Sequence, residues 1–358
     1  MAAGDFTAST MSTVLLKQEE MFADARSNRE LQYPLDSAKS LLENQLVRFD
    51  KATILKGKNC VQVKAAFLKA CRDATVDMTD SENDEVDCTY DGAEIESDAV
   101  TFEANKAWRE PFVVWDDECA DMYTFEDKLA YALAIATLNL EKRISTDVIA
   151  FLHANAMANL YTDTYGSIVG VTTEFPANEW TPDLLAEFDI TAEFAEIRNP
   201  ILLTGTNFKN AIYNAQYNFA NLDQKDQRLK FDAWRWYMDP RTVDSTVGAK
   251  ATFLFDAGAV AFWAKNEFTN LAPMQQTGDQ ATFALPSRNL KYRDGQSMVP
   301  VMFDVYMKRD CKIATVGPSG KRRYGTFVDV WATYGIQLGP EDCGNGTGIL
   351  EFVNVPAV

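Results

Sequence analysis

The feature that most constrains this fold is a long helical pattern within the segment from Asp116 to Asn155. Apolar residues recur there at steps of three and four, the spacing that places side chains on one face of an α-helix. These residues are Phe125, Leu129, Ala132, Ala136, Leu140, Ile144, Val148 and Leu152. We therefore predict one helix over 124–155, about 45 Å long at ~1.5 Å per residue.

The start of this helix is also specified by the sequence. Thr124 predicts an N-cap, and Asp127 three residues later predicts a carboxylate variant of the capping box. No glycine or proline follows before Gly166. Because an ordinary helix has only about 11 to 12 residues, few folds accommodate one of this length.

A membrane span and a coiled coil are the two alternatives for this segment. A span needs about 20 apolar residues, but the uncharged run covers only Leu129 to Leu140, with charged residues on both sides. A coiled coil needs a strict seven-residue repeat, which the mixed steps do not keep. We therefore predict a helix laid across a sheet and no membrane segment.

Composition indicates a globular protein that does not bind DNA by neutralising its phosphates. The chain has 358 residues, of which 47% are hydrophobic, and the length favours two domains. Its formal net charge of −18 opposes close contact with nucleic acid. The charge is uneven, since 73–98 holds 11 acidic residues and no lysine or arginine. We interpret this tract as an exposed acidic loop.

The spacing of the cysteines and the composition of residues 1–20 indicate in which cellular compartment the protein folds. The cysteines are too far apart for a Cys-x-x-Cys zinc or redox pair, which favours free thiols in a reducing compartment. Residues 1–20 contain only a three-residue apolar run, Val14 to Leu16, so we expect no signal peptide. The six cysteines are Cys60, Cys71, Cys88, Cys119, Cys311 and Cys343.

The first half of the chain predicts an arm, a helix and a hairpin. Residues 13–29 form a polar helix with a sparse apolar face, which needs a partner surface to be stable. Strand-like runs at 60–67 and 100–115 flank the acidic tract and predict an extended hairpin with a long tip. Asp36 is expected to cap a second helix with the stripe Ala38, Leu41, Leu42, Leu46 and Phe49.

After the long helix the pattern mixes strands and helices. A strand over 166–175 and a short helix within 179–188 come first, and 206–220 is also predicted to be helical. Residues 250–268 indicate a strand that turns into a helix at Asp256. The end of the chain predicts strands at 299–316, 327–338 and 348–355.

Sequence motifs for phosphate and metal binding are incomplete. Residues 317–321, GPSGK, lack the spacing of a phosphate loop and indicate a β-turn. The adjoining basic cluster Lys321 to Arg323 is interpreted as a solvated turn, with weak binding of phosphates or an acidic neighbour as the alternative. Asp80, Glu82 and Asp84 match the first ligands of a calcium loop, but Glu85 replaces the required glycine. We predict no cofactor and no metal site.

Candidate catalytic residues are equally few. His153 is the only histidine, which excludes zinc sites built on several histidines. No G-x-S-x-G nucleophile motif accompanies it, so we interpret His153 as a helix-packing residue. A pair for glycoside hydrolysis cannot be chosen without geometry among the carboxylates Asp116, Asp117, Glu118 and Asp121. We predict no catalytic residue and no enzymatic activity.

The order of these parts resembles that of the major capsid proteins of tailed bacteriophages (Caudoviricetes), which have the Hong Kong 97-type shell fold. Residues 85–121, EVDCTYDGAEIESDAVTFEANKAWREPFVVWDDECAD, look similar to capsid proteins of phages infecting Bacteroidetes. The resemblance implies an α+β fold in five parts. They are an N-terminal arm (1–50), an extended loop (51–115), a peripheral domain (116–198) with spine helix 124–155, an axial domain (199–286) and returning peripheral-domain strands (287–358).

The resemblance also implies a function. Such proteins assemble as hexamers and pentamers into an icosahedral head that encloses double-stranded DNA, with portal, scaffold or decoration proteins as candidate partners. The expected location is the virion, after assembly in the bacterial cytoplasm. Some family members cross-link lysine to asparagine, and Lys56, Lys58 and Lys64 lie in the expected loop. The alternatives are an encapsulin-like compartment around a cargo enzyme, an intracellular enzyme using paired carboxylates and a binding module that does not assemble.

Overall fold

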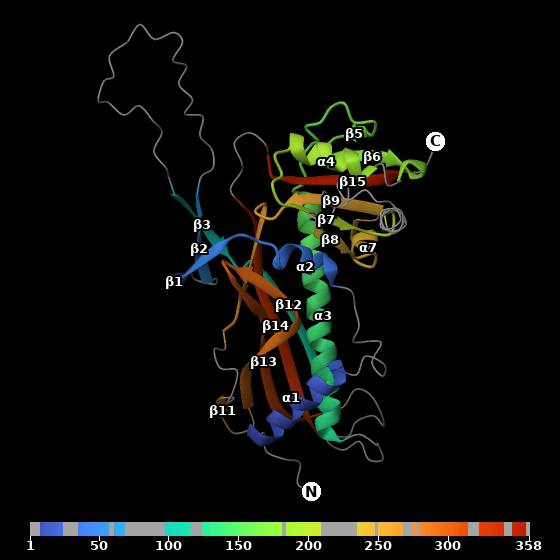
Figure 1. Cartoon of the computed structure of the whole chain (residues 1–358). Helices are drawn as coiled ribbons and strands as arrows, with labels where there is room; N and C mark the ends of the chain where they lie inside the picture. Colours follow the sequence, from blue (N-terminus) through green and yellow to red (C-terminus); the bar gives the residue numbers. More distant parts are fainter. Residues whose placement is uncertain are drawn as a thin grey trace, which may run out of the picture.

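The computed structural model describes most of the chain as helices, strands and the loops between them (Figure 1). The described residues are 8–23, 35–56, 61–68, 97–115, 124–180, 184–208, 235–247, 250–267, 275–277, 280–313, 322–339 and 346–355. Expectations for the acidic tract beyond residue 68, for the helix at 206–220 beyond residue 208 and for the turn at 317–321 lie outside these residues.

One helix, α3 (Phe125–Ala154), runs through the molecule as the sequence predicts (Figure 1). Thr124 Oγ1 accepts from the backbone N–H of Asp127, while Asp127 Oδ2 accepts from the N–H of Thr124, which completes the capping box. Six of the eight predicted stripe residues are buried, and Phe125 and Ala132 pack against the same core at its margin. None of the described helices is long and apolar enough to cross a membrane.

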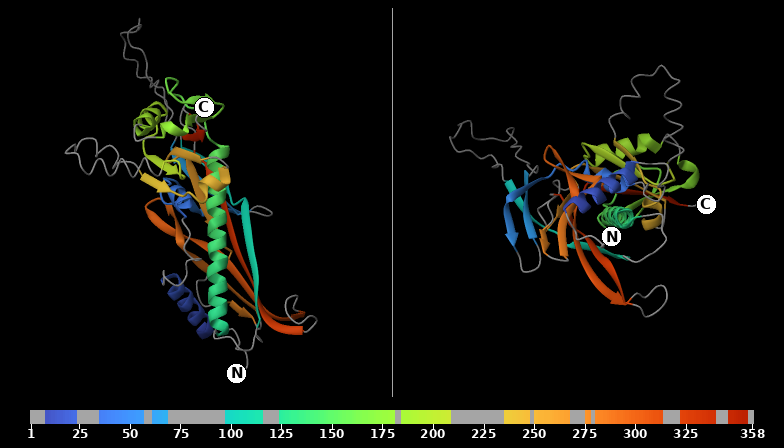
Figure 2. Two further views of the ribbon diagram at one scale, coloured as in Figure 1. Left: turned by 90° about the vertical axis from the view of Figure 1, so that its right-hand side faces the viewer. Right: turned by 90° about the horizontal axis from the view of Figure 1, so that it is seen from below.

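A long antiparallel sheet lies along α3, and we call it the long sheet (Figures 1 and 2). Its strand β14 pairs with β13 and β10 along one edge and with β4 along the other. Within the predicted strand 327–338, residues 328–336 alternate in burial, with every second side chain in the core. The long sheet consists of β4 (Lys106–Trp115), β10 (Val260–Lys265), β11 (Gln275–Thr277), β12 (Gln280–Asp294), β13 (Ser297–Ile313) and β14 (Arg322–Leu338).

A second six-stranded sheet, the end sheet, lies at the C-terminal end of α3 (Figure 1). One of its faces joins the α3 core through residues such as Phe253 and Ile349. The other face packs under α4 (Leu184–Phe194) in a separate aromatic cluster around Phe188 and Phe352. In spatial order its strands are β5 (Ser167–Val169), β6 (Thr172–Pro176), β15 (Ile349–Val355), β9 (Lys250–Asp256), β7 (Pro200–Thr204) and β8 (Arg235–Met238).

The third sheet stands to the side of the long sheet, and we call it the projecting sheet (Figure 1). Its antiparallel strands are β1 (Arg48–Lys56), β2 (Val61–Leu68) and β3 (Ser97–Glu103). The pairing of β2 with β3 confirms part of the predicted hairpin. The predicted second strand, 100–115, is divided, because β3 ends at Glu103 and β4 (Lys106–Trp115) pairs with β14 in the long sheet. The sequence did not indicate the third strand, β1, which begins where the second helix was expected to continue.

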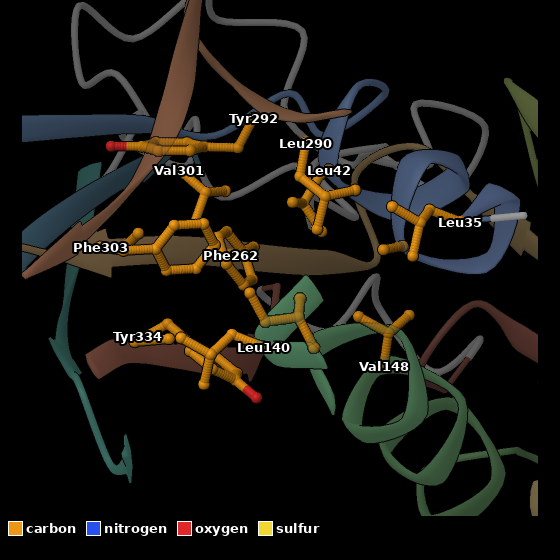
Figure 3. Packing of buried hydrophobic residues seen from close by; sticks show 14 of the residues in the cluster. Leu35, Leu42, Leu140, Val148, Phe262, Leu290, Tyr292, Val301, Phe303 and Tyr334 are labelled. Atoms are coloured by element: carbon orange, nitrogen blue, oxygen red, sulfur yellow. The ribbon is translucent and has the colours of Figure 1, made fainter. Parts of the chain in front are cut away.

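The core that joins these layers is centred on α3 (Figure 3). Leu140 of α3 lies beside Phe262 of β10 and Tyr334 of β14, whereas Val148, two turns farther along α3, lies below Leu35. Phe262 stacks on Tyr334 with ring centroids 5.4 Å apart. Leu35 and Leu42 close the same cluster from the side of the second helix, so one apolar core connects the helices to the long sheet.

The second helix, α2 (Asp36–Leu42), is shorter than predicted. Asp36 does not cap it; Ser37 at the N-terminal turn donates from its N–H and hydroxyl to the buried carboxylate of Asp239. The helix ends because Asn44 donates to the Ser40 carbonyl and Gln45 forms two hydrogen bonds with the backbone of Phe262. Phe49 therefore enters β1, and Leu46 is half exposed.

The predicted helix after Asp256 is wrong. Residues 256–259 form a turn in which the Ala259 N–H donates to the Asp256 carbonyl, and β10 follows. All five residues from Val260 to Ala264 are buried. A continuous apolar run of this length fits a strand covered on both faces as well as a helix. The periodicity of the sequence therefore could not distinguish the two.

The strands also pair differently from the expected division into an axial domain (199–286) and returning peripheral-domain strands (287–358). Within 199–286, β7, β8 and β9 belong to the end sheet, whereas β10, β11 and the first part of β12 belong to the long sheet. β15, expected among the returning strands, pairs instead with β6 and β9. A strand's apolar pattern predicts that it pairs, but not with which sheet.

The remaining helices are short or peripheral. The N-terminal helix α1 (Ala8–Ala23) lies beside the first half of α3, where it buries Val14 (Figure 2). A 3₁₀ turn, Ala177–Glu179, precedes α4, and α7 (Val243–Val247) packs between α3 and β9.

Candidate assembly surfaces

Most candidate chemical residues from the sequence lie outside the described residues. This applies to the calcium-like set Asp80, Glu82 and Asp84, to the carboxylates Asp116, Asp117, Glu118 and Asp121, to Lys58 and Lys321, and to five of the six cysteines. Within the described part of the chain, Cys311 is a free thiol, and no three His, Cys, Asp or Glu side chains are grouped to hold a metal ion.

Glu141 is a buried carboxyl group that joins α3 to β12. Its two oxygens accept from Ser287 Oγ at 2.5 Å and Asn289 Nδ2 at 2.8 Å. Burial raises the pKa of Glu141, against the lowering effect of these hydrogen bonds. A cavity of about 440 Å³ opens beside it between α1, α3 and β12. Because both carboxylate oxygens already accept hydrogen bonds from the protein, Glu141 links α3 to β12 and is not positioned as a catalytic acid.

Asp147 joins α3 to two strands of the long sheet. Its Oδ2 accepts from Trp108 Nε1 of β4 at 2.9 Å and from the Tyr334 hydroxyl of β14 at 2.7 Å. The Arg143 guanidinium lies over the Trp108 ring, 5.1 Å from its centroid. Burial and the nearby Asp147 raise the pKa of Tyr334, so its hydroxyl remains a donor. This contact fixes β4, the strand that follows the projecting sheet.

His153 and Glu351 join the end of α3 to the end sheet. His153 Nδ1 lies 2.8 Å and 2.9 Å from the two carboxylate oxygens of Glu351 in β15. The sequence indicates His153 as a packing residue and not Glu351, because nothing in a single sequence pairs residues 198 positions apart. The signal for Glu351 is an acidic residue that interrupts the apolar run from Ile349 to Val353.

The projecting sheet meets the rest of the molecule over a small anchor. Phe102 and Ala104 are buried there, and Phe102 and Glu103 pass directly over Gly335 of β14. A Cβ at Gly335 would lie 2.1 Å from the Glu103 carbonyl oxygen. Glycine within a strand often marks such a close backbone approach. Among the described strands, β1 and β3 are its two edges, and edge strands offer hydrogen-bonding groups to other chains.

Several exposed apolar side chains belong to β5, α4 and the loops beside β5, elements that lie at the far end of the molecule (Figure 1). Phe194 is 56% exposed and Val169 is 55% exposed. Tyr161 packs against Phe194 with ring centroids 4.9 Å apart, which ties the loop before β5 to α4. We call these residues the apolar tip: Leu160, Tyr165, Ile168, Val169, Val171, Ile190 and Phe194. Large exposed apolar patches commonly mark protein–protein contacts.

The N-terminal helix has the partner surface that its weak amphipathicity required. Lys17 Nζ lies 2.6 Å from Asp127 Oδ1 and donates to Thr124 Oγ1, so it contacts the capping box of α3. Arg288 of β12 donates to the Glu19 carbonyl at 2.7 Å. These polar contacts join the arm to α3 and to β12.

Comparison with known proteins finds similarity at the level of structure only. No protein family matches the sequence, and no curated protein matches it. A solved structure of Mycobacterium phage Che8 aligns with 87% of this chain and 93% of its own, at 14% identity and a TM-score of 0.46. The capsid structure of the cyanophage P-SCSP1u aligns over 88% of both chains, at 12% identity and a TM-score of 0.45.

A third solved structure extends the comparison to nearly every residue. The chain of Mycobacterium phage Bobi aligns over 99% of this chain and 100% of its own, at 12% identity and a TM-score of 0.44. The mixed helix-and-sheet fold itself rests on the described helices and strands of this chain.

Proposed function

We propose that this chain is the major capsid protein of a tailed bacteriophage, a structural subunit that self-assembles into an icosahedral head. The observation that carries the proposal is the projecting sheet, which stands outside the main body on a small anchor. The described edge strands of this sheet, β1 and β3, offer backbone hydrogen-bonding groups to another chain. A neighbouring copy in a shell would supply the missing contacts, and no active site is needed for this role.

The proposed parts follow the Hong Kong 97-type division, with α1 as the N-terminal arm and α3 as the spine helix. The projecting sheet and the residues between β2 and β3 would be the extended loop. The long sheet with α3 would form the peripheral domain, and the end sheet with α4 the axial domain. The apolar tip then lies on the axial domain, where copies would meet as hexamers and pentamers.

The negative net charge of the chain supports the proposed role as a shell around DNA. A formal net charge of −18 disfavours tight binding to DNA phosphates, which suits a wall around packaged double-stranded DNA. We propose the virion as the location, after assembly in the host cytoplasm, with portal, scaffold or decoration proteins as further partners. The likeness of residues 85–121 to capsid proteins of phages infecting Bacteroidetes makes such a phage the proposed source.

An encapsulin-like compartment is the second candidate, because the same architecture also serves shells that enclose an enzyme. Purified particles distinguish the two: nuclease-protected double-stranded DNA supports a phage head, and a co-purifying enzyme supports a compartment. The paired-carboxylate enzyme has less support, since Glu141 and Glu351 are both engaged inside the protein.

Deletion of residues 74–97 tests the role of the extended loop. We expect the variant to keep the melting temperature of the wild-type monomer, because this acidic, polar stretch of sequence offers few apolar side chains to a core. We expect shell assembly, followed by negative-stain electron microscopy, to fail or to give fragile particles.

The matched control replaces Asp80, Glu82 and Asp84 with their amides, which keeps the length of the loop and removes charge. Assembly by this control, together with failure of the deletion, assigns the effect to the loop itself. Normal shells from the deletion variant would show that the loop plays no part in assembly.

A further inference from the structure

The cavity beside Glu141 lies between the N-terminal helix and the body of the protein. Its walls come from α1, α3 and β12, and its volume is about 440 Å³. Figure 2 shows α1 lying along the first half of α3. Sites that bind small molecules usually enclose about 300–1,000 Å³, so this cavity is large enough to hold a ligand.

The cavity has an exposed rim and a buried floor. Glu19, Pro286 and Arg288 are exposed, and we call them the rim. Arg288 reaches from β12 to α1, where its guanidinium donates to the Glu19 carbonyl oxygen at 2.7 Å. We call the buried lining residues the floor: Gln18, Thr137, Glu141, Ala284, Leu285 and Ser287.

Three polar side chains of the floor form hydrogen bonds within the protein. Glu141 accepts from Ser287 at 2.5 Å and from Asn289 at 2.8 Å. The Thr137 hydroxyl donates to the Leu133 carbonyl oxygen at 3.0 Å. These groups therefore have partners without a ligand.

Gln18 differs from them. It is only 7% exposed, and among the described residues no group forms a hydrogen bond with its side-chain amide. Buried polar groups nearly always have a hydrogen-bond partner, because burial without one is costly. An amide carries donor N–H groups and an acceptor oxygen side by side. The ligand group that matches both is a second amide.

The other lining residues favour an uncharged ligand with an apolar body. A ligand carboxylate would share the cavity with Glu141, and a ligand ammonium group would share it with Arg288. A neutral group avoids both repulsions, and it avoids the cost of burying a charge. Leu15, Ala284 and Leu285 supply apolar surface for the rest of the ligand.

We propose that this cavity binds a small uncharged carboxamide with a short apolar body, whose amide pairs with that of Gln18. The carboxamide belongs either to a free molecule or to a side chain of a peptide. Because Gln18 lies on α1 and the rest of the floor on α3 and β12, the ligand joins the arm to the body. Its binding stabilises the docked position of α1 by mass action, and the site does not depend on the shell function.

Saturation-transfer NMR on the full-length protein tests the site with three probes of similar shape: isobutyramide, isobutyrate and isobutylamine. We expect isobutyramide to bind about tenfold more tightly than either charged probe. Hydrogen exchange should show greater protection of α1 with isobutyramide and no change in β13. A blocked alanine–glutamine–alanine peptide distinguishes the sources: its binding indicates a peptide side chain, and binding of isobutyramide alone indicates a free molecule.

Gln18→Leu removes the amide and keeps a side chain of similar size with good helix propensity. It should weaken isobutyramide binding about tenfold and leave the melting temperature unchanged or higher, because an unpaired buried amide is gone. Leu16→Ala is the matched control on α1, since Leu16 is 57% exposed and does not line the cavity. This control should bind isobutyramide as the wild type does.

Equal binding of isobutyramide by Gln18→Leu and the wild type would overturn the proposal. So would failure of both isobutyramide and the peptide to bind, since water would then be the partner of Gln18. If hydrogen exchange shows that α1 detaches in Gln18→Leu, the ranking of the three probes on the wild type decides. Equal or tighter binding of a charged probe would contradict an amide site.

Discussion

At the scale of single residues, the apolar face of α3 is the part of the molecule least able to accept a charge. Ala136 is 2% exposed at the middle of that face. Ala136→Asp should destabilise the protein by about 3–5 kcal/mol, the usual cost of an uncompensated buried charge. Chemical denaturation of the purified variant, or its absence from the soluble fraction, measures this loss.

The matched control is Ala150→Asp on the same helix, where the side chain is exposed. It should cost about 1 kcal/mol or less, through the unfavourable helix dipole near the C-terminal end. Equal stability of the two variants would show that the buried face of α3 has been assigned incorrectly.

The capping box at the start of α3 gives a prediction about pH. Hydrogen bonds from Lys17 and then Thr124 lower the pKa of Asp127 to about 2, from a usual 3.8. The stability it contributes is therefore present above about pH 3.8 and is lost as the pH falls through about 2. At pH 6 we expect Asp127→Asn to be destabilised by about 0.5–2 kcal/mol, as for other lost helix caps.

Denaturant titrations of wild type and Asp127→Asn between pH 6 and pH 3 should show the difference shrinking on acidification. Glu126→Gln is the control, because it removes a like charge from the same turn and leaves the capping box intact. A loss in Glu126→Gln as large as that in Asp127→Asn would assign the effect to the helix dipole.

Local signals explain which residue roles were predictable. Thr124 and Asp127 lie three positions apart, so their capping box was read correctly from the sequence. The cap of α2 comes from Asp239, more than 200 positions away, and the partner of His153 comes from β15. Such contacts depend on the tertiary fold, and a single sequence does not show which two residues form them.

At the scale of elements, the anchor of the projecting sheet depends on the absence of a side chain at Gly335. Gly335→Ala would place a Cβ 2.1 Å from the Glu103 carbonyl oxygen and 2.7 Å from the Phe102 ring. We expect a loss of about 1–3 kcal/mol, typical of overpacking. Hydrogen exchange should show greater opening of β2 and β3 than of β13.

Gly258→Ala is the control for this substitution, since its nearest neighbour would be a flexible carboxylate oxygen at 3.4 Å. It should leave the projecting sheet unchanged. Wild-type protection of β2 and β3 in Gly335→Ala would mean that the close approach at β14 does not hold the sheet.

The elements themselves were predicted unequally. Long periodic segments gave α3 and the strands of the C-terminal region correctly, because burial on one face imposes a clear period. The short run after Asp256 is apolar on both faces and was assigned to the wrong element. β15 and β10 were grouped with the wrong neighbours, because strand pairing is decided by tertiary packing.

At the scale of the whole molecule, α3 is joined to the long sheet and to the end sheet by polar contacts. Glu141 joins it to β12, Asp147 to β4 and β14, and His153 to β15. The projecting sheet and the apolar tip lie away from this framework (Figure 1). A stable centre with contact surfaces at its margins is suited to a subunit that repeats in a closed assembly.

The central claim is that copies of this chain assemble into a shell, and the mass and shape of the purified protein test it most directly. After nuclease treatment, light scattering and negative-stain electron microscopy should show closed shells, or rings of five and six copies. A stable monomer of 40.0 kDa over a wide range of salt and protein concentration, also when co-expressed with its neighbouring genes, would contradict the account.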